Sequence, residues 1–404
     1  MTFFSTQAQS LPAPQPPEEG AFVTGEYRNM LAEWGLSEDV IQARIDESFQ
    51  QLFYGNDTTE RIYYPVGDDM AYIEDVDNQD VRSEGISYGM MISVQLDKQE
   101  EFDRLWTWAR TKMYHEDGPW AGYFCWHTTP EGLCINLNPA SDGEIWFVTA
   151  LLFASARWGD GEGIYNYEEQ AHSILNTMLH KEEDGTVRAT NLFDEETQLV
   201  VFVPQAGTNS GFTDPSYHAP HYYELWAQWA VQDNDYWVDA AAAARQHWRD
   251  AAHPETGLMA NYTEFTGEPR HSGDYGHVYY ADAWRIGMMI AMDYAWFAPS
   301  NWHVEQTNRY LQFFHEQGIG QYNSRFLIDG TPEGNQHRSS GLIAMNASAT
   351  LASSDVIAWD FIEEFWNTPL ATGQYRYYDG LLQMMALLQL SGNYRIYTPD
   401  TQEG

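Results

Sequence analysis

The sequence predicts an all-α protein in which helical hairpins form a ring. Apolar residues recur at helical spacing in a dozen segments spread over the 404 residues. Some segments, such as the one that follows Glu144, are apolar on nearly every side and belong in an interior, whereas others are amphipathic and should cover them. The strand–helix–strand spacing of a parallel sheet is absent. We therefore expect buried and amphipathic helices to alternate around the ring.

Each predicted helix has its own apolar pattern and a length that is usual in globular proteins. The first patterns are "TGEYRNMLAEWG" and "EDVIQARIDESFQQLF", and the last is "LLQMMALLQL". In chain order, we expect helices at 24–35, 38–53, 86–97, 100–113, 144–158, 165–179, 221–232, 234–249, 281–297, 304–317, 340–353 and 381–390.

Residues 1–20 are rich in proline and glutamine, which predicts a disordered leader. Order should begin near Ala21, and because no proline-rich linker follows, residues 21–404 are expected to form a single catalytic domain. The leader lacks the basic and apolar regions of a secretory signal. This favours a cytoplasmic protein, with secretion as the alternative if the N-terminus has been trimmed.

The formal charge of -39 excludes nucleic acid and anionic membrane surfaces as partners, because both would be repelled. Only three lysines occur, at Lys98, Lys112 and Lys181. Scattered acidic residues with few lysines suggest solubility at high salt, where screening weakens the self-repulsion. No run of 18 apolar residues is present that could span a membrane.

Aromatic residues make up 15% of the chain, with 16 Trp and 26 Tyr. Such side chains stack well on sugar rings, but they also fill large helical cores, and composition alone leaves both interpretations open.

The two cysteines, Cys125 and Cys134, flank the turn-like "TTPEG" and could meet across a hairpin. Two free thiols are the expectation for a cytoplasmic protein, and two cysteines alone make no metal site. The acidic run "EDVDNQD" lacks the glycine and the closing glutamate of an EF-hand, so we expect a solvated loop. No His-x-x-x-His pair lies on a predicted helix. We expect neither a catalytic metal nor a cofactor.

Three polar clusters open predicted apolar helices, and each contains a carboxylate: Glu84 in "VRSEG", Asp142 in "PASDGE" and Asp282 in "YYADAWR". Taken singly, Glu84 could be an ordinary first-turn residue stabilised by the helix dipole, and Asp142 an ordinary cap. Together, carboxylates that converge at one end of a helical ring are what glycoside hydrolysis requires.

Longer motifs identify a family at this point. The chain contains "GEYRN", "IYYPVGDDMAY", "VRSEGISYGMM", "PASDGEIWFVTALLFASARWGDG", "DPSYHAPHYYEL", "DAWR" and "TGQYRYYDG". From about Gly25 to the final "LSGNYRIY" it resembles glycoside hydrolase family 8, within it the branch of xylanases and reducing-end xylose-releasing exo-oligoxylanases. The resemblance implies an (α/α)6 barrel with an acidic cleft, and hydrolysis of β-1,4-xylosidic bonds with inversion.

The resemblance also implies roles for the three carboxylates. Glu84 matches the general acid, Asp282 the general base, and Asp142 the aspartate that holds the sugar in the reactive subsite. Because a general acid must be protonated, burial and the nearby Asp142 should outweigh the helix dipole and Arg82 in setting the pKa of Glu84. An inverting enzyme should also hold its acid and base about 6.5–9.5 Å apart.

The remaining site residues are expected to bind substrate. Tyr217 matches a tyrosine that helps the base to hold the attacking water, and Trp126 matches an aromatic platform for the glycone sugars. Arg82 and Arg285 match arginines that line the carboxylates. Tyr377 and Tyr378 lie in a cleft motif, and the sequence does not choose between them. His337 could reach the reducing-end hydroxyl or be an ordinary loop residue.

The site of cleavage along the substrate is less constrained. In the exo-acting branch, a loop before a late helix walls off the leaving-group side; here that loop is "DGTPEGNQHRSSGLIAMNA". Its "HRSS" stands where a Leu-His-Pro-like wall is expected. We expect a monomer that releases xylose from the reducing end of xylo-oligosaccharides, with endo-cleavage as the alternative. An enzyme for cellulose or chitosan, and a non-catalytic glycan-binding protein, are the other readings.

Overall fold

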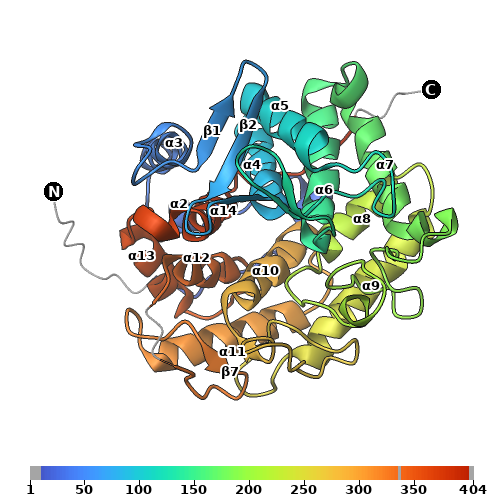
Figure 1. The fold of residues 1–404 in the computed structure, drawn as a ribbon. Coiled ribbons are helices and arrows are strands. Elements are labelled where there is room, and N and C mark those ends of the chain that lie inside the picture. The colour runs from blue at the N-terminus through green and yellow to red at the C-terminus, as the bar shows by residue number, and fades with distance from the viewer. Residues whose placement is uncertain (1–10, 335–337, 400–404) are drawn as a thin grey trace.

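The computed structural model describes residues 11–334 and 338–399. Over these residues the helices form two concentric rings, which is an (α/α)6 barrel, as the sequence predicted (Figure 1). The inner ring consists of α4 (Ser83–Gln95), α6 (Ser141–Trp158), α8 (Pro220–Trp229), α10 (Arg285–Phe297), α12 (Ser340–Ala349) and α14 (Tyr378–Leu390). The outer ring consists of α3 (Glu38–Tyr54), α5 (Gln99–Trp108), α7 (Tyr167–His180), α9 (Asn234–Ala251), α11 (Trp302–Gln317) and α13 (Ala358–Asn367).

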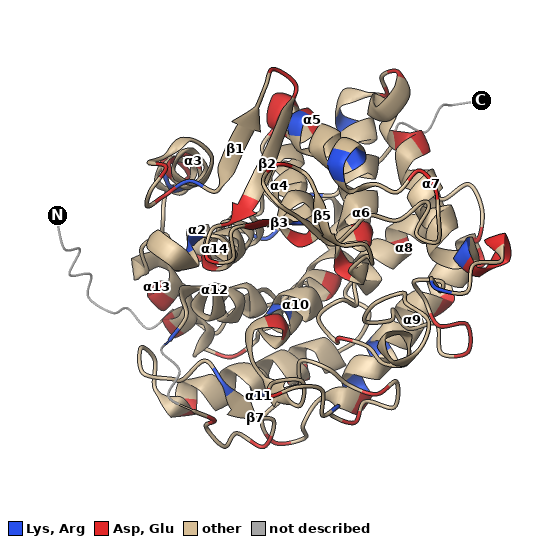
Figure 2. Cartoon of the chain, viewed as in Figure 1, with Lys and Arg blue, Asp and Glu red and all other residues tan. Residues whose placement is uncertain are grey.

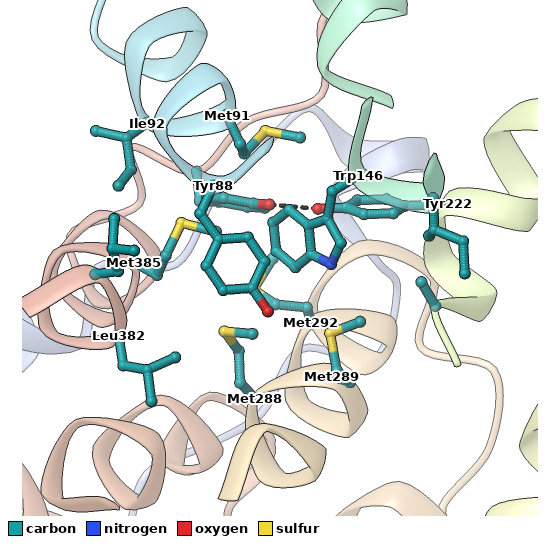
Figure 3. Close-up of a cluster of buried hydrophobic side chains, with 14 of the residues drawn as sticks. Tyr88, Met91, Ile92, Trp146, Tyr222, Met288, Met289, Met292, Leu382 and Met385 are labelled. Carbon is teal, nitrogen blue, oxygen red and sulfur yellow. Dashed lines mark hydrogen bonds between the residues drawn. The ribbon is translucent and has the colours of Figure 1, made fainter. Parts of the chain in front are cut away.

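Large side chains fill the middle of the inner ring (Figure 3). The rings of Tyr88 and Trp146 lie 4.6 Å apart, and Tyr222 meets Trp146 edge-on at 5.4 Å. Methionines such as Met288 and Met385 occupy the irregular space around them, which suits their flexible side chains. The barrel axis is therefore a packed core, and a cleft can form only at one end of it.

The outer helices bury one face each. In α9 the buried residues Trp237, Ala241, Ala244 and Trp248 recur every three or four positions. Helix α13 was not among the predicted helices. Its buried residues Trp359, Phe361, Ile362 and Phe365 recur at helical spacing, so the sequence carries the signal and the prediction missed it.

Short strands at the start of α4 were also not predicted. They form an antiparallel sheet in the order β1 (Tyr63–Val66), β2 (Met70–Asp75), β3 (Asp80–Arg82), β4 (His127–Thr128) and β5 (Cys134–Asn136). A second pair joins β6 (Val278–Tyr279) to β7 (Phe326–Leu327). Strands β3 to β7 have only two or three residues, and β1 and β2, "YYPV" and "MAYIED", carry apolar or aromatic residues at successive positions, so no alternating pattern marks them. Because β3 continues directly into α4, this sheet positions the start of that helix.

Residues 11–20 differ from the predicted disordered leader. The indole N–H of Trp359 donates to the carbonyl of Pro12 at 2.9 Å, and the hydroxyl of Tyr294 donates to that of Pro17 at 2.8 Å. Gly20 lies so close to α10 that a Cβ there would be 2.1 Å from the carbonyl oxygen of Trp296. This segment therefore packs on the barrel, followed by α1 (Ala21–Thr24) and α2 (Met30–Trp34). The rest of the predicted leader, 1–10, lies outside the described residues.

The full chain carries 59 acidic and 20 basic residues, and Figure 2 shows acidic residues spread over many elements. Within the described part of the chain, no helix is both long enough and apolar enough to cross a bilayer.

Candidate active site

The three predicted carboxylates meet where inner helices begin. Glu84 is the second residue of α4, Asp142 the second residue of α6, and Asp282 lies in the 3₁₀ turn η5 (Ala281–Trp284) that leads into α10. Helices α4 and α6 approach closely here, because a Cβ on Gly143 would lie only 2.5 Å from Oγ of Ser83. Convergence therefore follows from helix packing at this end of the barrel.

Arg285 joins the three carboxylates. Its Nη1 lies 2.7 Å from Oε2 of Glu84 and 3.4 Å from Oδ2 of Asp142, and its Nη2 lies 3.4 Å from Oδ1 of Asp282. Its side chain is only 2% exposed. Nη2 also approaches Oδ2 of Asp214 at 3.9 Å, so one buried cation serves four carboxyl groups. Such a deficit of positive charge favours protonation of at least some of them.

Glu84 has the environment of a proton donor. Its side chain is 16% exposed, and its Oε1 accepts a hydrogen bond from the hydroxyl of Tyr377 at 2.9 Å. Burial is the largest influence and raises the pKa of Glu84, whereas Arg285 and Arg82 lower it. The negative charge of Asp282 raises it further. The expected dominance of burial is therefore present, and Asp282 is a source of the negative field around the carboxyl.

Asp142 and Asp282 occupy different environments. Burial raises the pKa of Asp142 to about 7, against the opposing effect of Arg285. Its Oδ1 accepts the N–H of Gly143 at 3.0 Å, but Ala140 occupies the N-cap position of α6, so the alternative that Asp142 is an ordinary cap is wrong. Asp282 is 29% exposed and is therefore the carboxylate most open to the cleft.

The structure separates the roles of the two tyrosines that the sequence left undecided. The hydroxyl of Tyr377 contacts Glu84, whereas that of Tyr378 donates to the carbonyl of Ala281 at 2.9 Å. Ala281 has a φ of 26°, a left-handed value that is strained for a residue with a side chain. Tyr378 thus helps to hold the strained residue that precedes Asp282.

Among the described residues, Arg82 makes no ion pair with Glu84, Asp142 or Asp282. It pairs with Asp75 and with Asp80, each at 3.0 Å, and its guanidinium lies 5.6 Å from the ring of Trp126. The expectation of a solvated loop is therefore wrong for Asp75 and Asp80, which are buried. His127 contacts Asp80 at 3.1 Å and stacks under Trp126 with ring centres 3.5 Å apart. Asp75 and Asp80 therefore position Arg82 and, through His127, the ring of Trp126.

The carboxylates lie between two cavities that share Arg82, Glu84, Tyr280, Ala281 and Asp282. The larger cavity has a volume of about 470 Å³ and the smaller about 270 Å³. Aromatic residues of the larger one are Trp126, Phe202, Tyr217, Tyr262, Tyr275 and Tyr280. The smaller one includes Asp77, Asn78, Ser324, Ser339, Gln374, Tyr375 and Asp379. An aromatic-lined cleft that extends to both sides of Glu84 and Asp282 suits an oligosaccharide.

Tyr217 lines the larger cavity. It is 8% exposed, and its ring lies 5.6 Å from the guanidinium of Arg285. His337 lies outside the described residues.

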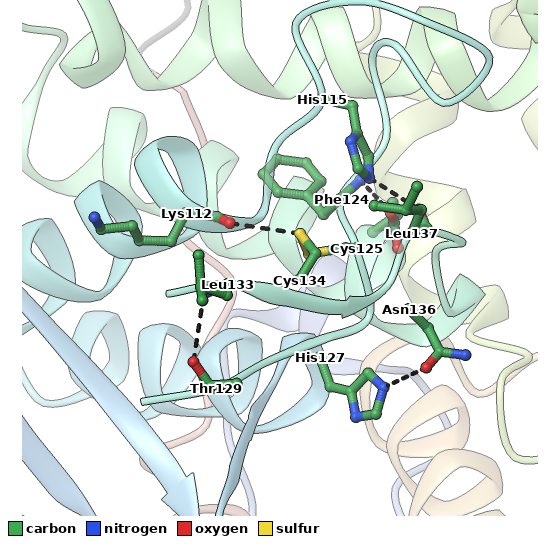
Figure 4. Close-up of a disulfide and its surroundings, with 11 residues drawn as sticks. Lys112, His115, Phe124, Cys125, His127, Thr129, Leu133, Cys134, Asn136 and Leu137 are labelled. Carbon is green, nitrogen blue, oxygen red and sulfur yellow. Dashed lines mark hydrogen bonds between the residues drawn. A yellow bond between two sulfur atoms is a disulfide. The ribbon is translucent and has the colours of Figure 1, made fainter. Parts of the chain in front are cut away.

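The two cysteines form a disulfide, so the expectation of free thiols is wrong (Figure 4). Their Cα atoms lie 6.1 Å apart, although the pairing of β4 with β5 places Thr128, and not Cys125, opposite Cys134. His115 has a ring nitrogen within 4.8 Å of both sulfur atoms, but the bonded sulfurs provide no thiolate for a metal. The disulfide closes the hairpin that carries Trp126.

Several residues of the site were missed by sequence reasoning. Asp214 lies in the quoted motif "DPSY", of which only the tyrosine was assigned. Asp75 and Asp80 were assigned to solvent because acidic runs usually are exposed. Asp379, in "YYDG", accepts hydrogen bonds from Ser339 at 2.8 Å and Ser340 at 3.0 Å. The signal available for Asp214 and Asp379 was their place inside motifs that already contained site residues.

The chain matches a family of known proteins over most of its length. The sequence pattern of glycosyl hydrolases family 8 matches residues 71–392. The chain belongs to this family. A reducing-end xylose-releasing exo-oligoxylanase of Paenibacillus barcinonensis is 46% identical over 385 residues, 94% of this chain and 99% of that protein. One from Halalkalibacterium halodurans is 44% identical over 389 residues, 95% of this chain and 98% of that protein.

Solved structures of family 8 members have the same fold. A crystal structure of a reducing-end xylose-releasing exo-oligoxylanase matches with a TM-score of 0.90 at 46% identity, covering 95% of this chain and 99% of that chain. A family 8 protein of Teredinibacter turnerae in complex with xylobiose also matches with a TM-score of 0.90, at 44% identity over 94% of this chain and 100% of that chain. The protein is therefore a glycoside hydrolase with the (α/α)6 barrel of family 8.

Proposed function

We propose that this glycoside hydrolase cleaves β-1,4-xylosidic bonds of xylo-oligosaccharides with inversion and releases xylose from the reducing end. The observation that carries the proposal is the pairing of Glu84 and Asp282 across one arginine in an aromatic-lined cleft. Glu84 contacts Nη1 of Arg285 and Asp282 contacts Nη2, so the two carboxyl groups are held apart and differ in exposure. The names of the relatives at 44–46% identity support xylo-oligosaccharides as the substrate class.

Glu84 acts as the general acid. Its raised pKa keeps a proton on the carboxyl, which it transfers to the glycosidic oxygen as the bond to the anomeric carbon breaks. Arg285 and Tyr377 contact different oxygens of the same carboxyl group, so the carboxylate that forms after proton transfer is stabilised at once.

Asp282 acts as the general base on a water molecule at the opposite face of the sugar. Its 29% exposure leaves room for that water, and the strained Ala281 together with Tyr378 fixes its direction. Tyr217 and Asp142 line the larger cavity and hold the sugar and the water in the reactive subsite. Because the water attacks directly, no covalent glycosyl-enzyme forms.

Cleavage at the reducing end is supported by the unequal cavities. The larger cavity, with Trp126, accommodates the glycone sugars, and the smaller one accommodates the leaving group. A smaller leaving-group side favours one xylose beyond the scissile bond.

One observation favours endo-cleavage as a second candidate. Arg338, Ser339 and Ser340 stand where the resemblance leads one to expect a bulkier wall. The guanidinium of Arg338 is held 2.5 Å from Oε1 of Glu364, and both serines donate to Asp379. These side chains are thus bound to protein groups, which leaves more space for a second leaving-group sugar.

Xylohexaose labelled at its reducing end distinguishes the two candidates. Labelled xylose as the first product is expected for exo-cleavage, whereas early labelled xylobiose or xylotriose would establish endo-cleavage. Parallel rates on xylotriose, cellotriose and chitosan oligomers test the substrate class, and xylotriose should be the fastest.

The catalytic assignment is tested with Glu84→Gln, which keeps the shape of the side chain but lacks the acidic proton. Hydrolysis should fall by about 10²-fold or more, in line with general acid catalysis. Hydrolysis at the rate of the unmodified protein would remove Glu84 from its role. Binding of xylo-oligosaccharides by this variant, measured by calorimetry, should persist.

A further inference from the structure

Four carboxyl groups surround Arg285, and the proposed reaction gives a role to three of them, Glu84, Asp142 and Asp282. Asp214 lies before α8, and its side chain is 0% exposed. Its Oδ2 is 3.9 Å from Nη2 of Arg285, the same nitrogen that contacts Asp282. A fully buried carboxyl group next to the general base must affect either the geometry or the charge of the site.

Asp214 organises the turn that supports Arg285. Its Oδ1 accepts the backbone N–H of Ser216 at 2.7 Å, and its carbonyl accepts the N–H of Tyr217 at 3.0 Å. The turn places the hydroxyl of Ser216 3.0 Å from Nη2 of Arg285, where it accepts a hydrogen bond, and sets the Tyr217 ring beside the guanidinium. Asp214 thus acts on the site through Ser216 and Arg285.

The second oxygen of Asp214 has no hydrogen-bond partner among the described residues. A buried carboxylate with an unsatisfied oxygen is costly, because its charge has lost water and gained too few donors. Arg285 offers little compensation at 3.9 Å, since it also serves Glu84, Asp142 and Asp282. A protonated carboxyl group, with one O–H donor and no net charge, fits this location better.

The groups that face Asp214 support the same state. Asp282 and Arg285 approach from η5 and α10, Tyr217 from the same turn, and Tyr262 from the loop before β6. Burial is the largest influence on the pKa of Asp214 and raises it well above its usual value, and Asp282 raises it further while Arg285 lowers it.

We propose that Asp214 is a positioning residue that stays protonated while the enzyme works. As a neutral group it fixes the Ser216–Tyr217 turn, and it leaves the charge of Arg285 to Glu84 and Asp282. An ionised Asp214 would add a second negative charge beside the base and would compete with Asp282 for Nη2 of Arg285. The inference rests on the proposed hydrolysis, but its protonation can be observed without activity.

Infrared difference spectroscopy at pH 7 tests the protonation directly. The variant Asp214→Asn should lack one protonated-carboxyl C=O band that the unmodified protein has. This band should therefore appear when the spectrum of the variant is subtracted from that of the unmodified protein. Loss of a carboxylate band instead would overturn the proposal. Asp75→Asn is the matched control, since Asp75 is also buried but is ion-paired with Arg82 at 3.0 Å, and its removal should take away a carboxylate band.

Kinetics test the positioning role. Asparagine can accept the Ser216 N–H and donate from its amide, as a protonated Asp214 does. Asp214→Asn should therefore change kcat and KM by no more than about threefold. Both limbs of the pH–activity profile should stay in place. A shift of both limbs to lower pH by about one unit would mean that a negative charge had been removed. Asp214→Ala, which loses the turn, should lower kcat by about 100-fold with little change in KM. An Ala variant as active as Asn would overturn the role in positioning.

The two proposals fail in different ways. If xylo-oligosaccharides are not the substrate, the unmodified protein shows no turnover of them, but the infrared band of Asp214 is still present. If Asp214 is ionised, turnover is normal and the protonated band is absent from the difference spectrum.

Discussion

Replacing Tyr377 with phenylalanine should move the alkaline limb of the pH–activity profile to higher pH. The Tyr377 hydroxyl donates to Oε1 of Glu84 at 2.9 Å, and this bond lowers the pKa of Glu84 because it stabilises the carboxylate. Removing the donor leaves the ionised form less stable. Glu84 then keeps its proton to higher pH, and the general acid stays active over a wider range.

The size of the shift follows from the strength of the bond. A hydrogen bond to a charged group contributes about 1.5–3 kcal/mol, and one pKa unit corresponds to about 1.4 kcal/mol, so complete loss would raise the pKa by about one to two units. Protonated Glu84 can donate to the same hydroxyl, which means that both forms lose part of the interaction. We therefore expect an upward shift of about one unit.

The assay is kcat/KM on xylotriose as a function of pH. Tyr378→Phe is the matched control, because that hydroxyl donates to the carbonyl of Ala281 and not to Glu84. It should leave the alkaline limb in place and lower kcat, since Ala281 loses a partner next to Asp282. An unchanged or lowered alkaline limb in Tyr377→Phe, or an equal shift in Tyr378→Phe, would refute this account of the general acid.

Three further predictions concern stability and packing. Reduction of the Cys125–Cys134 disulfide, or Cys134→Ser, should lower the free energy of unfolding in urea by about 2–3 kcal/mol for so short a loop; equal unfolding midpoints with and without reductant would contradict this. The melting temperature should rise from low to molar sodium chloride, because screening weakens repulsion among 59 acidic residues, and a flat or falling curve would leave the acidity unexplained. Gly85→Ala would place a Cβ 2.6 Å from the Tyr377 ring, so kcat/KM should fall by about tenfold or more; full activity would show that the close approach is unimportant.

The helical part of the fold could be predicted because its signal is periodic. Helices such as α3 and α9 repeat apolar residues over many positions, and their limits agree closely with the expected ranges. The strands β1–β5 are short and give no such signal, whereas α13 is as long as α5, α8 and α12 and was missed although its apolar residues recur at helical spacing. The packing of residues 11–20 depends on contacts with Trp359 and Tyr294, far away in the sequence.

The site could be predicted in part, for a related reason. Glu84, Asp142 and Asp282 each open an apolar helix, which marks them in the sequence. That one guanidinium, of Arg285, joins all three is a property of the folded barrel, as is the burial of Asp214. Likewise, Tyr377 and Tyr378 are adjacent in the chain, and only the structure shows which hydroxyl reaches the acid.

The central claim is that Glu84 and Asp282 act as the acid and base of an inverting hydrolysis, and the configuration of the fresh product tests it most directly. Xylotriose should be followed by proton NMR in the first minutes, before the sugars mutarotate. The account predicts that the new reducing end of the xylobiose product appears first as the α-anomer. Early appearance of the β-anomer would mean retention through a covalent intermediate, and would contradict the role of Asp282 as a base acting on water.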